Sequence, residues 1–330
     1  MQQILRLALI LGSAALISAH PRSIRPPMIE IRQATTTSPV PAASAQPAGP
    51  ASGNVGQGNL TDVDILQLYV LAIWKNPYQA DNIISALTLE HLESTFYQQG
   101  FSKFPDSDFM QLGLTQAQVN NLKTVGGTEA THVKQLSAAI SATGAQPVQQ
   151  CTYNFNLTSV QQMVVTARVL EAVGISAYLG AAPLVKTAPV LSVAAEIVTV
   201  EARHQTFIRI ISNIIPVPNA FDTPLGPRAV FTLASQFITS CPAGSNLNIP
   251  PFTAIALQGG GMGITGGQTL VLANPGQPAG AQFCAFLDQG MAMFVPLMSG
   301  TCQVPQGLSG EVYMMVTNAQ SIMDNAILAG

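Results

Sequence analysis

Glutamate and histidine are scarce in this 330-residue chain, and two short segments combine them at the same spacing. Glu129 is followed three residues later by His132, and Glu201 is followed three residues later by His204. Residues three apart on a helix lie on one face, so each segment would present a carboxylate and an imidazole in one direction. A single pair of this kind is most often a solvated surface pair. Two of them, using two of the four histidines, indicate a shared site for metal ions.

Two further segments each carry a glutamate followed by a tyrosine. Glu90 precedes Tyr97 by seven residues, and Glu171 precedes Tyr178 by the same distance. Seven residues are nearly two helical turns, so each glutamate and its tyrosine share a face about 10 Å apart along the axis. The order along the chain is therefore Glu…Tyr, Glu-x-x-His, Glu…Tyr, Glu-x-x-His. This order predicts a twofold repeat of a helix pair.

The repeat matches the ligand set of a dimetal carboxylate site inside a helical bundle, with one Glu from each of two helices and Glu-x-x-His from each of the other two. The predicted metal ligands are Glu90, Glu129, His132, Glu171, Glu201 and His204. Four carboxylates would neutralise two metal ions, either iron or manganese, which the ligand types do not distinguish. We expect Glu129 and Glu201 to bridge the two ions. The alternative is a bundle whose buried glutamates bind nothing, although unpaired buried carboxylates are costly.

The repeat also decides between neighbouring glutamates. Glu93 shares a helix face with Glu90, but its counterpart in the second half is Gly174, whereas Glu90 matches Glu171. Glu90 is therefore the predicted ligand. Glu196 has no acidic counterpart before the first Glu-x-x-His segment, and we interpret it as a residue of the polar helix face.

The two tyrosines of the repeat have two possible roles. Tyr97 and Tyr178 are predicted to donate hydrogen bonds that orient ligand carboxylates across the bundle. Alternatively, they are ordinary tyrosines of a helical core. No catalytic residue is assigned from the sequence.

The elements that must position these residues follow from hydrophobic periodicity. Apolar residues recur at spacings of three and four in the segments 83–97, 130–140, 160–179 and 190–214. From about residue 250, short runs rich in Val, Leu and Phe predict strands at 269–272, 282–287, 291–295 and 311–316. The chain is therefore predicted to be mainly α, with a four-helix bundle over residues 61–243 and a small β-sandwich-like region over residues 244–330.

Several of these segments together resemble the secreted fungal ferritin-like proteins, which are related to stress-response and plant desiccation-related proteins. The segments that carry the resemblance are 89–97, 127–132, 174–180, 200–204, 221–227, 237–242 and 312–318. The resemblance covers the chain from about residue 61 to its end and implies a ferritin-like dimetal fold. It does not imply one particular reaction.

One segment departs from the family pattern. The family helix would run almost continuously from Asp64 to Leu87, but residues 67–84 intervene and contain Pro77 and the single tryptophan. Proline removes a backbone donor and clashes with the preceding helical turn. We predict that residues 67–84 are an insertion, which a retained intron in the gene model would explain. The alternative is a genuine helix with a proline kink.

The N-terminal segments predict secretion. Residues 1–19 have an apolar run after Arg6 and small residues before His20, which is typical of a signal peptide. Residues 20–60 are rich in Pro, Ala, Ser and Thr and are predicted to be a disordered linker. Asn59 and Asn156 begin Asn-x-Thr sequences and are predicted glycosylation sites if exposed.

The cysteine count agrees with an oxidising compartment. The chain has four cysteines, which allow three disulfide pairings or a set of free buried thiols. The pairs Cys151–Cys241 and Cys284–Cys302 are favoured, because each pair then stays within one predicted region. No later stretch is predicted to be long and apolar enough for a membrane span.

The composition narrows the function classes. Only 9% of residues are charged and the net charge is −3, so no basic field is present to bind nucleic acid. The first hypothesis is an oxygen- or peroxide-handling dimetal oxidoreductase. The second is a non-catalytic secreted stress or desiccation-related protein that sequesters metal or uses it for stability. The sequence identifies no protein or cell-wall partner.

Overall fold

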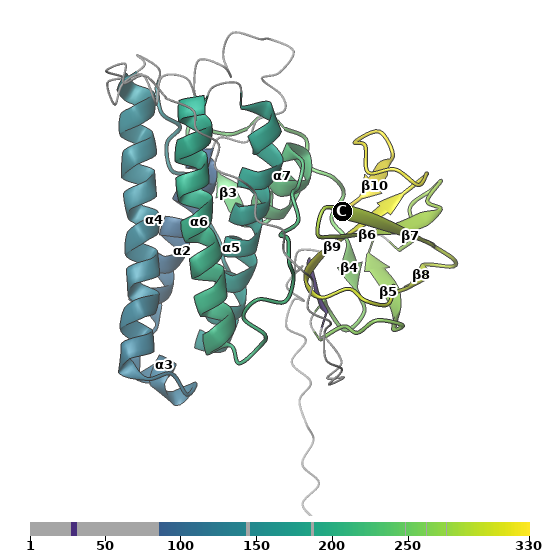
Figure 1. Cartoon of the computed structure of the whole chain (residues 1–330), viewed down its shortest axis with the longest axis horizontal. Coiled ribbons are helices and arrows are strands. Elements are labelled where there is room, and N and C mark those ends of the chain that lie inside the picture. The colour runs from purple at the N-terminus through teal and green to yellow at the C-terminus, as the bar shows by residue number, and fades with distance from the viewer. Residues whose placement is uncertain are drawn as a thin grey trace, which may run out of the picture.

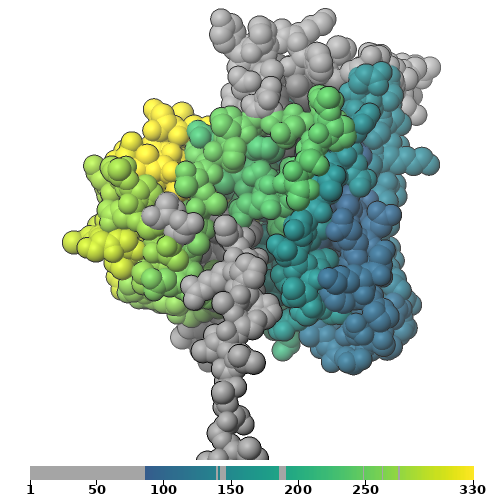
Figure 2. Space-filling view, turned by 180° about the vertical axis from the view of Figure 1, so that it is seen from behind, coloured from purple at the N-terminus to yellow at the C-terminus, as the bar shows by residue number. Residues whose placement is uncertain are grey.

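The computed structural model describes residues 28–31, 86–142, 146–185, 188–247, 249–261, 263–274 and 276–330. The predicted signal peptide, the glycosylation acceptor Asn59 and the predicted insertion at 67–84 lie outside these residues. The described chain forms a bundle of long helices with a β-rich region beside it (Figure 1). The two parts also lie side by side when seen from behind (Figure 2).

The helical part is built from long, roughly aligned helices (Figure 1). The long helices are α2 (Ala86–Lys103), α4 (Gln116–Ala142), α5 (Val160–Ala181) and α6 (Ala188–Ile211). Shorter elements are α3 (Asp106–Gln111), the 3-10 turn η2 (Ala182–Leu184) and α7 (Pro227–Ser235). Helix α2 packs against α4 and α5, and α6 packs against α5 and α4. Each of the four predicted helical segments therefore lies mostly within one of the long helices.

Helix α4 begins well before the segment that periodicity predicted. Val119, Leu122 and Val125 are buried at spacings of three, so the helix already has an apolar face in its first turns. Gly126 follows on the side that meets α2, where a Cβ atom would lie 2.8 Å from the Tyr97 Cβ. This glycine thus lets the two helices approach closely instead of ending the helix.

The β-rich region contains two antiparallel sheets. The larger sheet has the order β1 (Met28–Ile31), β9 (Gly310–Thr317), β6 (Phe283–Asp288) and β7 (Met291–Pro296), and β10 (Ile327–Ala329) also pairs with β9. The smaller sheet has the order β4 (Ala256–Leu257), β5 (Thr269–Asn274) and β8 (Thr301–Gln303). A separate two-stranded ladder joins β2 (Thr152–Tyr153) to β3 (Ile238–Ser240).

The larger sheet is buried on both faces. Phe286 and Met314 contribute to a core shared with the smaller sheet, which gives the region its sandwich-like character. Their neighbours Leu287, Tyr313 and Met315 belong instead to the core of the helical bundle. Successive side chains of a strand point to opposite faces, so one sheet covers the bundle and the smaller sheet at once.

Polar contacts join the sheet to the helices. The Tyr313 hydroxyl donates to the Ala172 carbonyl oxygen at 3.1 Å and shares a 2.8 Å hydrogen bond with the Ser176 hydroxyl. Arg209 on α6 donates through Nη1 to Glu311 on β9. The β region is therefore fixed to α5 and α6 by buried polar groups as well as by apolar packing.

Both cysteine pairs favoured from the sequence are disulfides in the structure. Cys151 is bonded to Cys241, which ties the chain before α5 to the end of β3. Cys284 is bonded to Cys302, which joins β6 of the larger sheet to β8 of the smaller one. Each bond therefore closes a contact between segments that are distant in sequence, and two disulfides are compatible with an extracellular protein.

Two expectations need correction. The predicted linker over residues 20–60 was expected to be without secondary structure, but Met28–Ile31 form β1 against β9, where backbone hydrogen bonds give even a short segment a partner. The region Val160–Leu184 is, by length and hydropathy alone, apolar enough to span a membrane, contrary to expectation. However, 78% of its most apolar window is buried inside the molecule, as in the core helix of a bundle.

Candidate metal centre

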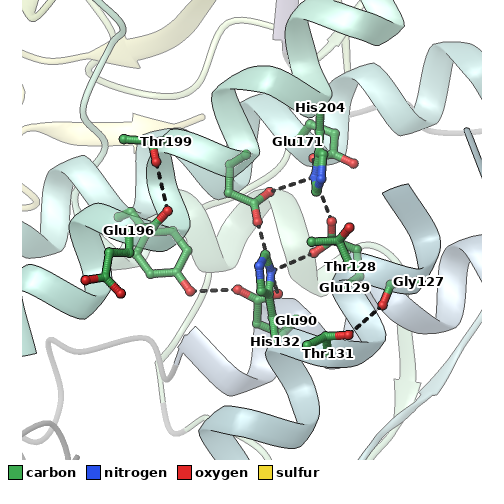
Figure 3. Close-up of polar contacts among 12 residues, drawn as sticks. Glu90, Gly127, Thr128, Glu129, Thr131, His132, Glu171, Glu196, Thr199 and His204 are labelled. Atoms are coloured by element: carbon green, nitrogen blue, oxygen red, sulfur yellow. Dashed lines mark hydrogen bonds and ion pairs between the residues drawn. The ribbon is translucent and has the colours of Figure 1, made fainter. Parts of the chain in front are cut away.

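The six predicted ligand side chains converge in the interior of the helical bundle. Figure 3 shows Glu90, Glu129, His132, Glu171 and His204 pointing toward one another from their helices. Glu90 comes from α2, Glu129 and His132 from α4, Glu171 from α5, and Glu201 and His204 from α6. All four glutamates are fully buried, and the His132 side chain retains 11% exposure.

These side chains form two overlapping groups of donors. The first group is Glu90, Glu129, His132 and Glu201, and the second is Glu129, Glu171, Glu201 and His204. Within each group, one ligand atom from every residue lies within 4.8 Å of the others. Glu129 and Glu201 belong to both groups. The arrangement is therefore that of two overlapping donor groups, each able to hold a metal ion, that share two carboxylates.

The first histidine sits among three carboxylates. His132 Nδ1 lies 3.1 Å from Glu90 Oε2 and 3.2 Å from Glu129 Oε2. It also lies 3.3 Å from Glu201 Oε1, which comes from the facing helix α6. The i, i+3 spacing of Glu129 and His132 brings both to this side of α4, as predicted from the sequence.

The second histidine has the corresponding environment in the other half. His204 Nδ1 lies 2.8 Å from Glu129 Oε1 and 3.1 Å from Glu171 Oε2. Glu201 Oε2 is 3.9 Å from the same nitrogen. The centroids of the two imidazole rings are 6.5 Å apart. The two halves of the sequence repeat thus face each other across the centre.

The two tyrosines cross from one half of the repeat to the other. Tyr97 on α2 donates a 2.5 Å hydrogen bond to Glu171 Oε1 on α5. Tyr178 on α5 donates a 2.6 Å hydrogen bond to Glu90 Oε1 on α2. Each tyrosine thereby leaves the other carboxylate oxygen free to face a histidine.

Burial dominates the electrostatics of the carboxylates. Desolvation raises the pKa of Glu90 to about 8, against the lowering effect of its hydrogen bond with His132. Desolvation also raises the pKa of Glu171 and holds that of Glu201 well above its usual range. For Glu129, burial acts in the same direction, but hydrogen bonds with both histidines outweigh it and lower the pKa. In the absence of a metal ion, the carboxylate cluster therefore retains protons that balance part of its negative charge.

The surrounding carboxylates raise the pKa of both histidines, although burial alone would lower it. Burial lowers the pKa of His132, but hydrogen bonds with Glu129, Glu201 and Glu90 outweigh that effect and raise it to about 12. The pKa of His204 is raised to about 10 by Glu129 and Glu171, again against burial. These shifts show that the site strongly favours positive charge.

The residues present fit bound metal ions. The buried oxygens of Glu201 have no partners among the described residues beyond two histidine contacts, His132 Nδ1 at 3.3 Å and His204 Nδ1 at 3.9 Å. Buried carboxylates with so little compensation are costly, and divalent cations between the helices would supply further partners. Carboxylate oxygens with imidazole nitrogens are donors that suit iron and manganese.

The comparison of the two halves of the sequence repeat did not select Glu93 as a metal ligand. In the structure, however, Glu93 is buried beside the metal centre. Its exposed fraction is 3%, and desolvation, followed by the charges of Glu201 and Glu129, holds its pKa well above the usual range. The i, i+3 spacing from Glu90 was a signal for this placement. The repeat argument discounted that signal because Gly174 occupies the matching position. Glu196, by contrast, is exposed on α6, as its interpretation as a polar-face residue requires.

The remaining predicted site lies away from the centre. Asn156 is exposed in the turn between β2 and α5, and Thr158 of the same Asn-x-Thr sequence is exposed as well. The acceptor sequence is therefore accessible on the surface.

Two comparisons with known proteins accord with this geometry. The family model described as a ferritin-like domain matches residues 79–213, a range that includes α2 to α6. Protein rds1 of Schizosaccharomyces pombe (strain 972 / ATCC 24843) is 24% identical over 158 residues, which cover 48% of this chain and 39% of rds1. The match thus spans about two fifths of the length of that relative. Both findings support a ferritin-like domain, and the structure gives this domain a buried cluster of acidic and histidine residues able to bind metal.

Proposed function

We propose that the chain is a secreted dimetal-carboxylate protein with a ferritin-like four-helix bundle, and that it handles oxygen or peroxide as an oxidoreductase. The observation that carries the proposal is the sharing of Glu129 and Glu201 by two otherwise separate donor groups. Two donor groups with common carboxylates suit a pair of ions that act together. The two disulfides support an extracellular or cell-wall location.

Each residue of the centre has a role in this proposal. Glu129 and Glu201 would bridge two iron or manganese ions, with Glu90 and His132 on one ion and Glu171 and His204 on the other. When bound, two such ions supply redox and Lewis-acid chemistry for oxygen or peroxide. Tyr97 and Tyr178 hold the terminal carboxylates in place through their hydrogen bonds. The surrounding helices exclude bulk water from the four buried carboxylates.

Burial of the centre also favours a second candidate function. All four carboxylates are fully buried, and a centre without ready access for a substrate would serve to sequester metal or to stabilise a secreted stress protein. In that case the ions would bind with the same ligands but without turnover. The two functions therefore differ in activity and not in metal content.

The test begins with metal analysis of the purified full chain. We expect two ions per chain, and oxidase or peroxidase turnover in the iron- or manganese-loaded protein. Glu129→Ala combined with Glu201→Ala should abolish stoichiometric binding, because both shared carboxylates are lost. Retention of two ions in this double variant would overturn the ligand assignment. Full loading of the wild-type protein without any turnover would favour sequestration.

A further inference from the structure

We propose that Glu93 is a seventh metal ligand, which joins the donor group of His204 and makes the two halves of the centre unequal. This inference rests on the dimetal function proposed above. It concerns a side chain that the twofold repeat of the sequence would exclude. The argument depends on where the Glu93 carboxylate lies and on what faces it.

The Glu93 carboxylate occupies space that its repeat-related residue leaves open. A Cβ atom at Gly174 would lie 3.0 Å from Glu93 Oε1, which is tighter than nine in ten real Cβ contacts. The missing side chain on α5 is therefore what allows this carboxylate to reach across from α2. Glu93 on α2 and Gly174 on α5 occupy equivalent positions of the repeat, so this pair makes the two halves of the centre different.

The Glu93 carboxylate lies in a buried, acidic environment. Glu93 is 3% exposed. The charges that act most strongly on it are those of Glu201, Glu129, Glu90 and Glu171. A buried carboxylate that faces four others needs a cation or a proton. A metal ion at the centre would supply the cation.

The contacts place Glu93 on the His204 side. The same Cβ position at Gly174 lies 3.5 Å from Glu201 Oε2, so Glu93 Oε1 and Glu201 Oε2 flank one point. Glu201 Oε2 is the oxygen that faces His204, whereas Glu201 Oε1 faces His132. Gly174 itself lies three residues after Glu171, another member of the His204 group. Glu93 lies outside both groups of donors within 4.8 Å of one another, but its carboxylate approaches Glu201 on the His204 side.

The experiment titrates the metal-free full chain with Mn²⁺ and follows binding by calorimetry and by the electron paramagnetic resonance of free Mn²⁺. We expect the wild-type protein to bind two ions. In Glu93→Gln, one of the two should bind about tenfold or more weakly, while the other is unchanged. The matched control is Glu196→Gln, the same chemical change at an exposed position of α6, which should leave both affinities unchanged.

Combination with histidine variants tests which ion is affected. Glu93→Gln added to His204→Ala should have little further effect, because both changes weaken the same ion. Glu93→Gln added to His132→Ala should weaken both ions. The opposite pattern, or two ions with wild-type affinities in Glu93→Gln, would overturn the proposal. A wild-type protein that binds no Mn²⁺ or Fe²⁺ would instead overturn the dimetal function itself.

A second variant guards against a folding defect. Gly174→Ala keeps every charge but places a methyl group against the Glu93 carboxylate, so it should weaken the same ion as Glu93→Gln. Circular dichroism of both variants checks that the bundle is intact. A folded Gly174→Ala protein with two wild-type affinities would contradict the role assigned to this contact.

Discussion

At the scale of single residues, protons and metal ions compete for the same buried groups. The pKa of Glu90 is raised to about 8, that of His204 to about 10 and that of His132 to about 12. Because these values are raised, the groups hold protons at neutral pH in the metal-free protein. Metal binding must release those protons, so raising the pH favours binding.

We therefore expect the apparent affinity for Mn²⁺ to rise between about pH 6 and pH 9, with net proton release at each step. The release can be measured by calorimetry at one pH in buffers of different ionisation enthalpy. An affinity that is constant over this range would mean that the proposed ligands are already deprotonated before metal binds.

The two tyrosine hydroxyls offer a second test at this scale. Tyr97→Phe should remove the tyrosine hydrogen bond to Glu171 Oε1, lowering stability by about 1.5–3 kcal/mol and metal affinity by about 10- to 100-fold. Tyr178→Phe should act equally through Glu90. The control is Tyr313→Phe, which loses hydrogen bonds with Ser176 and Ala172 away from the centre. It should lower stability without changing metal affinity, as judged by chemical denaturation and Mn²⁺ titration.

Glu93 shows how far the sequence could predict the centre. The repeat brought six residues together, because helical spacing alone decides which face each side chain occupies. It excluded Glu93, because a repeat assumes that equivalent positions have equivalent roles. Gly174 breaks that equivalence, since the Glu93 carboxylate lies close to the position that a side chain at residue 174 would occupy. Such a vacancy is a property of two packed helices and is invisible in either segment alone.

At the scale of elements, the least predictable features are those that depend on close approach. Helix α4 was predicted only over residues 130–140, whereas it begins at Gln116 and continues through Gly126 and Gly127. The backbone of α5 likewise meets the loop before α7. Gly180 is so close to this loop that a Cβ atom would lie 1.8 Å from the Leu225 carbonyl oxygen. The loop is held there by a 3.0 Å hydrogen bond from the Leu225 amide to the Ser176 carbonyl.

We predict opposite effects on stability when Gly180 and Gly127 are each replaced by alanine. Gly180→Ala should destabilise the protein by about 1–3 kcal/mol or more, because a backbone atom cannot yield as a side chain can. Gly127→Ala, at an exposed helical position with nothing within 4 Å of the new Cβ, should stabilise it by about 0.5–1 kcal/mol. Urea denaturation of both variants provides the measurement. A stabilised Gly180→Ala protein would show that the loop does not pack on α5 in this way.

At the scale of the whole molecule, residue composition predicted the main strands but not their relation to the bundle. The apolar runs of β6 and β9 were predicted as strands, and the structure shows that one face of their sheet completes the core of the helices. Long-range packing of this kind depends on shape complementarity between parts far apart in sequence. Strand β1 is a further case, because it pairs Met28 with Tyr313 of β9, far along the chain.

The ion pair between bundle and sheet tests whether the two parts unfold together. Glu311 on β9 meets Arg209 of α6 and lies 3.6 Å from Arg168 Nε of α5, and both arginine side chains are almost fully buried. Glu311→Gln would leave these arginines without their carboxylate. Removing one partner of a buried pair costs about 3–5 kcal/mol, because the other charge stays desolvated.

We expect the wild-type protein to unfold in one calorimetric transition and Glu311→Gln to unfold earlier, with the β region separating from the bundle. Metal binding should survive at low temperature, since Glu311 lies outside both donor groups. Asp106→Asn is the control, because its pair with Lys123 is on the surface and solvent already screens it. An unchanged transition in Glu311→Gln would mean that apolar packing of the sheet alone joins the two parts. Early unfolding with retained metal binding would show that the β region supports the bundle without forming the metal centre.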